Sequence, residues 1–156
     1  MDDLVKLNLR IAAHWLGTLD AEQESYLSFA SVCCGELIPS AQELKVHLAV
    51  ERQRQHNSLS IATLNRHYLR FARLAAKDIS AGKMEMLIRL GITLEQAELL
   101  ANLTDDAMNR LAFGRDGPII QFAREAFMRG LALHHRAAKY HAIAFVATAL
   151  ARSLRA

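Results

Sequence analysis

The sequence predicts an all-α protein. Apolar residues recur at intervals of three and four along most of the chain, which is the spacing that places them on one side of a helix. Several of these stretches begin with a helix-capping pattern, in which Ser, Thr or Asp is followed three residues later by Glu or Gln. The 156 residues include only seven glycines and two prolines. No segment combines alternating polarity with paired turn signals, so we expect no strand, even at short β-like pieces such as "PII".

The N-terminal segment predicts two helices separated by a glycine. Gly17 is expected to end the first helix, since glycine readily adopts the backbone conformation found after a helix C-terminus. Asp20 and Gln23 form a capping pattern that begins a second helix over "DAEQESYLSFASVCCGEL". The apolar side of the first helix is predicted to consist of Leu4, Leu7, Ile11 and Trp15.

A third helix is predicted after Ser40, which forms a capping pattern with Glu43 ahead of Leu44 and Leu48. The polar run Glu51–Ser58 follows and is the best candidate for a linker. We therefore divide the chain into an N-terminal helical extension, residues 1–55, and a principal helical unit, residues 56–156.

The longest amphipathic helix is expected at about Ser60–Ile79. Its apolar side comprises Ile61, Leu64, Tyr68, Phe71 and Ala75. A row of basic residues lies roughly opposite, formed by Arg66, Arg70, Arg73 and Lys77. Such a row suits contacts to a phosphate backbone, although charged rows on helices are also common as plain solvated faces.

Three short helices are predicted next, over a region that includes "MLIRLGITLEQAELLANLT". Gly91 would end the first of them, and Thr93 with Gln96 would cap the second. Thr104 would cap the third, where two aspartates suit the positive end of a helix dipole. From Ile119 to about residue 154 we expect one long helix, or two that are broken near Gly130.

The composition argues against an enzyme, a metal protein and a membrane protein. The chain has no glycine-rich phosphate loop, and its most apolar segment has about eleven residues, whereas a membrane span needs about twenty. His134 and His141 share a predicted helix face, but Arg136 and Lys139 between them would repel a metal ion. We expect no cofactor, no metal and no small-molecule substrate.

The cysteine content and the N-terminus predict a cytoplasmic protein. Cys33 and Cys34 are adjacent, and neighbouring cysteines rarely form a disulfide with each other because the intervening peptide strains it. We expect both to be small, half-buried residues of a helix in a reducing compartment. The first ten residues are charged and do not resemble a secretory signal.

The region from Asn65 to Ala112 carries an ordered series of motifs. It contains Asn65, Tyr68 and Leu69, then "RLGI" and the pair Glu95 and Ala97, then "LANLT", Met108 and a final Leu-Ala. This order resembles the FlhD family, whose members activate flagellar genes together with FlhC. From Arg89 onward the alignment with the family pattern needs no gap. Between Tyr68 and Arg89, this chain has about three more residues than the pattern.

The resemblance implies a helical homodimer that binds promoter DNA with a FlhC-like partner and acts as a transcriptional activator subunit. In the family, the zinc site belongs to FlhC. The net charge of +3 permits contact with DNA without requiring it. Candidate contacts to the DNA backbone are Arg66, Arg70, Arg73, Lys77, Arg129, Arg136 and Lys139. The implied dimer core consists of Tyr68, Leu90, Gly91, Ile92, Leu100, Leu103, Met108 and Leu111.

The chain departs from the family pattern in two places, and a second function stays open. No cysteine follows Leu111 and Ala112, where some members carry one that links the dimer, and nothing in residues 1–55 matches the family. Relatives also occur as regulators on mobile elements. The alternative is a helical adaptor that binds proteins and never contacts DNA, with the apolar segment Ile143–Leu150 as one place for a partner helix to dock.

Overall fold

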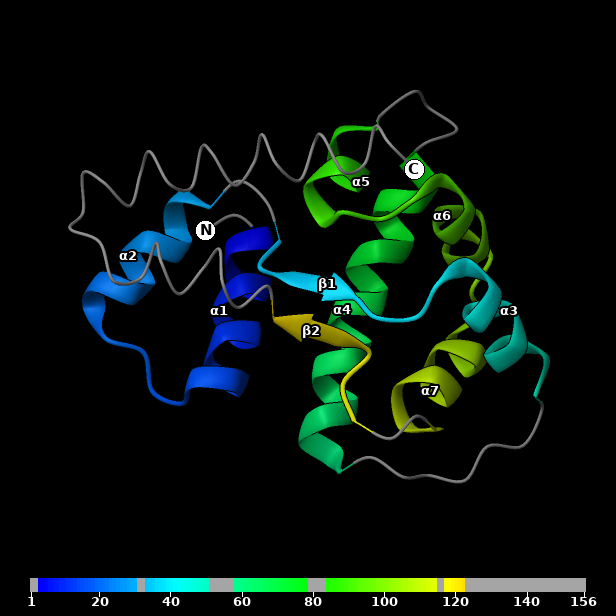
Figure 1. Cartoon of the computed structure of the whole chain (residues 1–156), viewed down its shortest axis with the longest axis horizontal. Coiled ribbons are helices and arrows are strands. Elements are labelled where there is room, and N and C mark those ends of the chain that lie inside the picture. The colour runs from blue at the N-terminus through cyan, green and yellow to red at the C-terminus, as the bar shows by residue number, and fades with distance from the viewer. Residues whose placement is uncertain (1–2, 31–32, 51–57, 79–83, 115–116, 123–156) are drawn as a thin grey trace. The chain divides into compact units, whose positions relative to one another are not determined.

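The computed structural model describes residues 3–30, 33–50, 58–78, 84–114 and 117–122 (Figure 1). Over these ranges the chain forms helices α1 to α7 and two strands of three residues each. The predicted all-α class is therefore confirmed over these ranges, which are mostly helical. The expectation that no strand occurs is wrong, because β1 (Gly35–Leu37) and β2 (Ile120–Phe122) pair in a two-stranded sheet.

The chain divides into two compact units. The first unit comprises Met1–Glu36, Ile88–Gly91 and Phe122–Ala156, and the second comprises Leu37–Leu87 and Ile92–Gln121. These bounds differ from the predicted division into residues 1–55 and 56–156. In particular, α3 (Ala41–Ala49) was assigned to the N-terminal extension but packs against two helices of the second unit. Residues 51–57, the predicted linker, lie outside the described ranges.

The first unit contains α1 (Asp3–Leu16) and α2 (Ala21–Phe29), which pack against each other. Gly17 has a φ of +81° and ends α1 as predicted. The capping pattern that begins α2 is present, since Asp20 Oδ1 accepts from the Gln23 N–H at 2.8 Å. Of the apolar side predicted for α1, Leu4, Leu7 and Ile11 are buried, whereas Trp15 is 45% exposed.

The stretch after α2 corrects the prediction of a longer helix. Backbone hydrogen bonding changes here, because the Cys33 N–H donates to Arg89 O at 2.7 Å and the Cys34 N–H donates to Asn8 Oδ1 at 2.8 Å. A helix would instead direct these groups to carbonyls four residues back. The helix therefore ends at Phe29, and β1 begins at Gly35.

The second unit is built around α4 (Leu59–Lys77). It packs against α6 (Leu94–Ala101) and α7 (Asp105–Gly114), and α3 in turn packs against the same two helices (Figure 1). The capping patterns predicted at Ser40 and Thr93 are both present. Thr104 caps α7 by accepting from the Ala107 N–H at 3.1 Å. Between α4 and α6 in the sequence, α5 (Glu85–Leu90) is followed by Gly91, whose φ is +66°. The last residues of α5, from Ile88, belong to the first unit.

The segment after α7 corrects the helix predicted from Ile119. Asn65 Oδ1 accepts from the Ile119 N–H at 2.8 Å, and Ile119 O accepts from the Ile38 N–H at 2.9 Å. Ile119 and Ile120 are buried, so the backbone here is held by distant residues rather than by its own turn. The rest of the predicted C-terminal helix, residues 123–156, lies outside the described ranges. None of the described helices is long and apolar enough to cross a membrane.

Three amide side chains are the buried polar residues of the described structure: Asn8, Asn65 and Gln96. Each bonds to backbone beside a strand. Asn8 accepts from the Cys34 N–H ahead of β1, Gln96 donates to Pro39 O beyond β1 at 2.9 Å, and Asn65 accepts from the Ile119 N–H ahead of β2. These side chains therefore satisfy buried backbone groups that the short strands leave unpaired.

We expect Asn65→Ala to lower the free energy of unfolding by about 2–4 kcal/mol. The substitution leaves the Ile119 N–H without its acceptor and Ala112 O without the Asn65 amide donor, and a buried polar group without its partner costs about 1–3 kcal/mol. Urea denaturation would measure this loss. Asn102→Ala is the matched control, because the Asn102 amide donates to Glu98 O on the surface, and we expect a loss of about 0.5 kcal/mol. Equal losses in the two variants would contradict the role assigned to Asn65.

Candidate nucleic-acid interface

The predicted basic row lies on α4, the central helix of the second unit. Ser58 caps this helix, and one side of it is buried over its whole length. The buried residues are Ala62, Leu64, Asn65, Tyr68, Leu69, Ala72, Ala75 and Ala76. Because that side is held against α6 and α7, the opposite side is presented to solvent in a fixed orientation.

Arg66 and Arg70 lie on this exposed side, one turn apart. Within the described part of the chain, no ion pair engages either guanidinium group. Lys77 is also exposed, in the last turn of α4. The side of α4 that faces solvent therefore carries three of the four predicted basic residues.

Arg73 is placed differently from the other members of the row. Its side chain is only 19% exposed, and it pairs with Asp105 Oδ1 at 2.8 Å. The same guanidinium nitrogen donates to Leu103 O at 3.0 Å. Arg73 thus links α4 to the start of α7, and it serves the packing of the second unit in addition to carrying charge.

Asp105 is a residue of this surface that the sequence assigned only to helix capping. Its hydrogen bond with Arg73, together with the positive charges of Arg73, Arg70 and Arg66, lowers the pKa of the Asp105 carboxyl below its usual value. The carboxylate is exposed and stays ionised at neutral pH. No local pattern indicates this role, because Asp105 lies 32 residues from Arg73 in the sequence.

Two leucines lie on the solvent side of the same helix. Leu59 is 74% exposed and Leu74 is 64% exposed, and Leu74 follows Arg70 by one turn. Exposed leucines contribute nothing to binding a phosphate backbone, whereas a protein partner could bury them. This side of α4 therefore combines positive charge with apolar surface.

The other residues predicted for the site fall into two groups. Arg129, Arg136 and Lys139 lie outside the described ranges. The motif residues of the proposed dimer core lie inside them, and seven are buried: Tyr68, Leu90, Ile92, Leu100, Leu103, Met108 and Leu111. Gly91 is exposed and adopts the positive φ that a helix end requires. Their burial accounts for the motif as packing, and a contact with a second copy stays a prediction.

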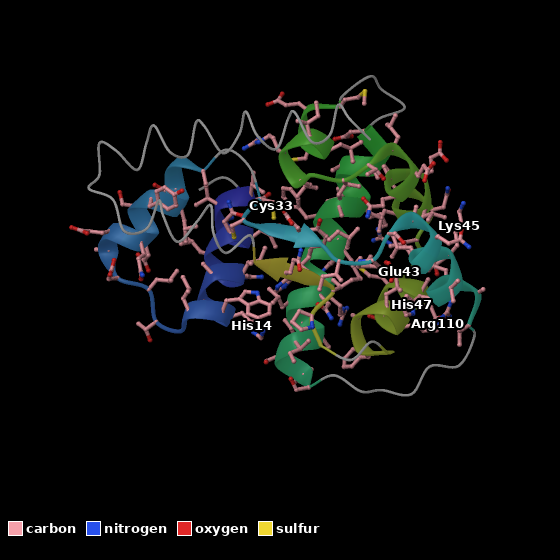
Figure 2. All side chains as sticks on the ribbon, in the orientation of Figure 1. His14, Cys33, Glu43, Lys45, His47 and Arg110 are labelled. Carbon is pink, nitrogen blue, oxygen red and sulfur yellow. The ribbon has the colours of Figure 1, made fainter. Side chains whose placement is uncertain are left out.

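The adjacent cysteines are more deeply buried than predicted and lie outside any helix. Cys33 is 4% exposed and Cys34 is fully buried, next to the start of β1 (Figure 2). Burial raises the pKa of the Cys33 thiol to about 12, despite a hydrogen bond from the Gly35 N–H. Burial, together with Cys33, also raises the pKa of Cys34. Both thiols are therefore protonated at neutral pH and poorly nucleophilic.

The described histidines and carboxylates do not converge on a common point. His14 lies near the end of α1, and its ring meets the Trp15 ring edge-on, with 5.4 Å between the two ring centroids. His47 lies on α3 (Figure 2). Among the described residues, no group of three or more His, Cys, Asp and Glu side chains could hold a metal ion.

The buried thiols predict a loss of stability in alkali. Folding raises the pKa of each thiol, so the thiols ionise at a lower pH in the unfolded chain than in the folded protein. The free energy of unfolding is therefore unaffected below the unfolded pKa and falls as the pH rises from there toward the folded pKa. The ordinary thiol pKa is 9.0, so ionisation in the unfolded chain costs about 1.4 kcal/mol per thiol at pH 10. Tyr26, whose pKa is raised by burial to about 12, adds to this loss above pH 10.

Urea midpoints at pH 8 and pH 10 would measure the effect. We expect the midpoint to fall at pH 10 and to fall less in the double variant Cys33→Ala/Cys34→Ala, which has no thiol to ionise. An equal fall in the two proteins would show that the thiols do not cause it.

No protein-family model, curated protein or solved structure matches this chain. The likeness to the FlhD family is therefore carried by the residues between Asn65 and Ala112 alone, and it stays a prediction.

Proposed function

We propose that this protein is a DNA-binding transcriptional activator subunit resembling FlhD, which acts as a homodimer together with a FlhC-like partner. The observation that supports the proposal most directly is the pair Arg66 and Arg70. Both are exposed on a helix whose other side is buried, and both are free of ion pairs within the described structure. Guanidinium groups in this setting suit contacts to DNA phosphates.

The same surface supports the proposal of a partner. Phosphate contacts position a protein on DNA but carry no sequence information directly. The exposed side of α4 carries Arg66 and Arg70 between Leu59 and Leu74, with Lys77 beyond them, and it has no Asn or Gln side chain to read base edges. Sequence recognition would then come chiefly from the FlhC-like protein, with this chain contributing affinity and orientation.

Removing the two exposed arginines should reduce the salt dependence of DNA binding. We expect Arg66→Ala/Arg70→Ala to lower the slope of log K against log salt concentration by about two, since each lost phosphate contact removes about 0.9. Fluorescence anisotropy with a labelled duplex at several salt concentrations would measure the slope. The matched control is Lys6→Ala/Arg10→Ala, which removes the same charge from exposed positions of α1 and should change the slope less. A slope that stays unchanged without Arg66 and Arg70 would remove α4 from the DNA interface.

The proposed homodimer can be tested directly. Large apolar side chains are exposed on the described surface, and a second copy could bury some of them: Trp15, Ile38, Val46, Val50, Leu59, Leu74, Met84 and Leu94. We expect sedimentation at micromolar concentration to give twice the chain mass of 17.4 kDa. A single species of the monomer mass would contradict the proposal.

A helical adaptor that binds only proteins is the second candidate, and the exposed Leu59 and Leu74 favour it. The two candidates differ in which substitutions matter. For an adaptor, Leu59→Ser/Leu74→Ser would release a partner in co-purification, and no promoter gel shift would occur. Co-expression with the product of an adjacent gene, followed by a gel shift, separates the candidates, and an adjacent gene for a cysteine-rich zinc protein would favour the activator.

A further inference from the structure

Asp105 brings a negative charge into the basic surface of α4. We define the α4 basic surface as Arg66, Arg70 and Arg73. The Asp105 carboxylate lies 2.8 Å from the Arg73 guanidinium, and its side chain is 85% exposed. The packing of α7 against α4 fixes this position, together with the bond from Arg73 to Leu103 O just before α7.

The charge of Asp105 acts on the two exposed arginines as well. Arg70 and Arg66 precede Arg73 by three and seven residues on α4, so they lie on nearly the same side of the helix as the Arg73–Asp105 pair. Their positive charges also lower the pKa of the Asp105 carboxyl. The interaction is reciprocal, because the carboxylate lowers the positive potential at each of the three arginines. A phosphate that approaches Arg66 and Arg70 meets the same carboxylate as a repulsive charge, and at physiological salt such effects reach about 8 Å.

We propose that Asp105 is an affinity-limiting residue, which competes with DNA phosphate for the α4 basic surface and so weakens the part of DNA binding that is independent of sequence. The inference rests on the proposed function and deepens it. Phosphate contacts supply essentially all of non-specific binding, so a carboxylate placed among them lowers affinity for every sequence equally. Tight binding to any DNA then requires further contacts, such as those of a partner that reads sequence.

The neighbouring Asp106 shows that this role is separable from helix capping. Asp105 and Asp106 are both in the first turn of α7 and both suit its positive dipole end. Asp106, however, pairs with Arg110 one turn along its own helix. Of the two carboxylates, only Asp105 bonds to α4. Asp106 is therefore a matched control, with the same charge and residue type in the same turn of α7.

The test compares Asp105→Asn with Asp106→Asn in the full chain. Asparagine keeps the size of the side chain and an oxygen that can accept from Arg73, while it removes the charge. The probe is a fluorescein-labelled 30-base-pair duplex of mixed sequence, titrated at low and physiological salt. We expect Asp105→Asn to bind about three- to fivefold tighter than the unsubstituted chain, and Asp106→Asn to bind less than about twofold tighter. Adding Arg66→Ala/Arg70→Ala to Asp105→Asn should abolish the gain.

The outcomes separate this inference from the proposed function. If the chain binds DNA through Arg66 and Arg70 but the two asparagine variants bind equally, the role of Asp105 is overturned and the function stands. If neither the unsubstituted chain nor Asp105→Asn binds the duplex at low salt, the proposed function fails and the inference fails with it. Thermal unfolding would check that each variant folds. If Asp105→Asn does not fold, Asp105→Ser, which also removes the charge, would be tested in its place.

Discussion

The structure depends on the hydrogen bonding of three buried amide side chains. Asn8, Asn65 and Gln96 each bond to backbone at one end of a short strand, where neither a helix nor a longer ladder supplies a partner. A strand of three residues pairs few of its own polar groups, so burial of the flanking segments requires partners from side chains. The side chains of three helices therefore determine where the two strands of the described structure can lie.

The same constraint determines which part of α4 is available for binding. Asn65 is buried and bonds to Ala112 O and the Ile119 N–H, which fixes how α4 is rotated about its axis. Arg66 and Arg70 are exposed as a result. Arg73, on the boundary between the buried and exposed sides, bonds to Leu103 O and Asp105 instead of facing solvent. A row that looks uniform on a helical projection thus contains two different kinds of arginine.

Local patterns predicted the starts of α2, α3, α6 and α7 correctly, and they placed most of the core. The capping patterns at Asp20, Ser40 and Thr93 connect residues three apart, so their hydrogen bonds form within one turn whatever the rest of the chain does. The buried stripe of α4 likewise follows from helical spacing. The exceptions are of two kinds. Asn65 is buried although it is polar, whereas Trp15 is exposed, and Leu48 and Phe71 are only half-buried, although all three are apolar. Helical spacing shows which residues share a side and not what covers that side.

Local sequence was enough to predict the helical class, the starts of α2, α3, α6 and α7 and the side of α4 that carries positive charge, because each depends on residues within about one or two turns. Only the tertiary structure decided that Gly35–Leu37 and Ile120–Phe122 form strands, and that Asp105 neutralises Arg73. The reason is sequence separation. The bond between Ile119 and Asn65 spans 54 residues, and the bond between Arg73 and Asp105 spans 32, so these contacts exist only when α4 and α7 have packed together.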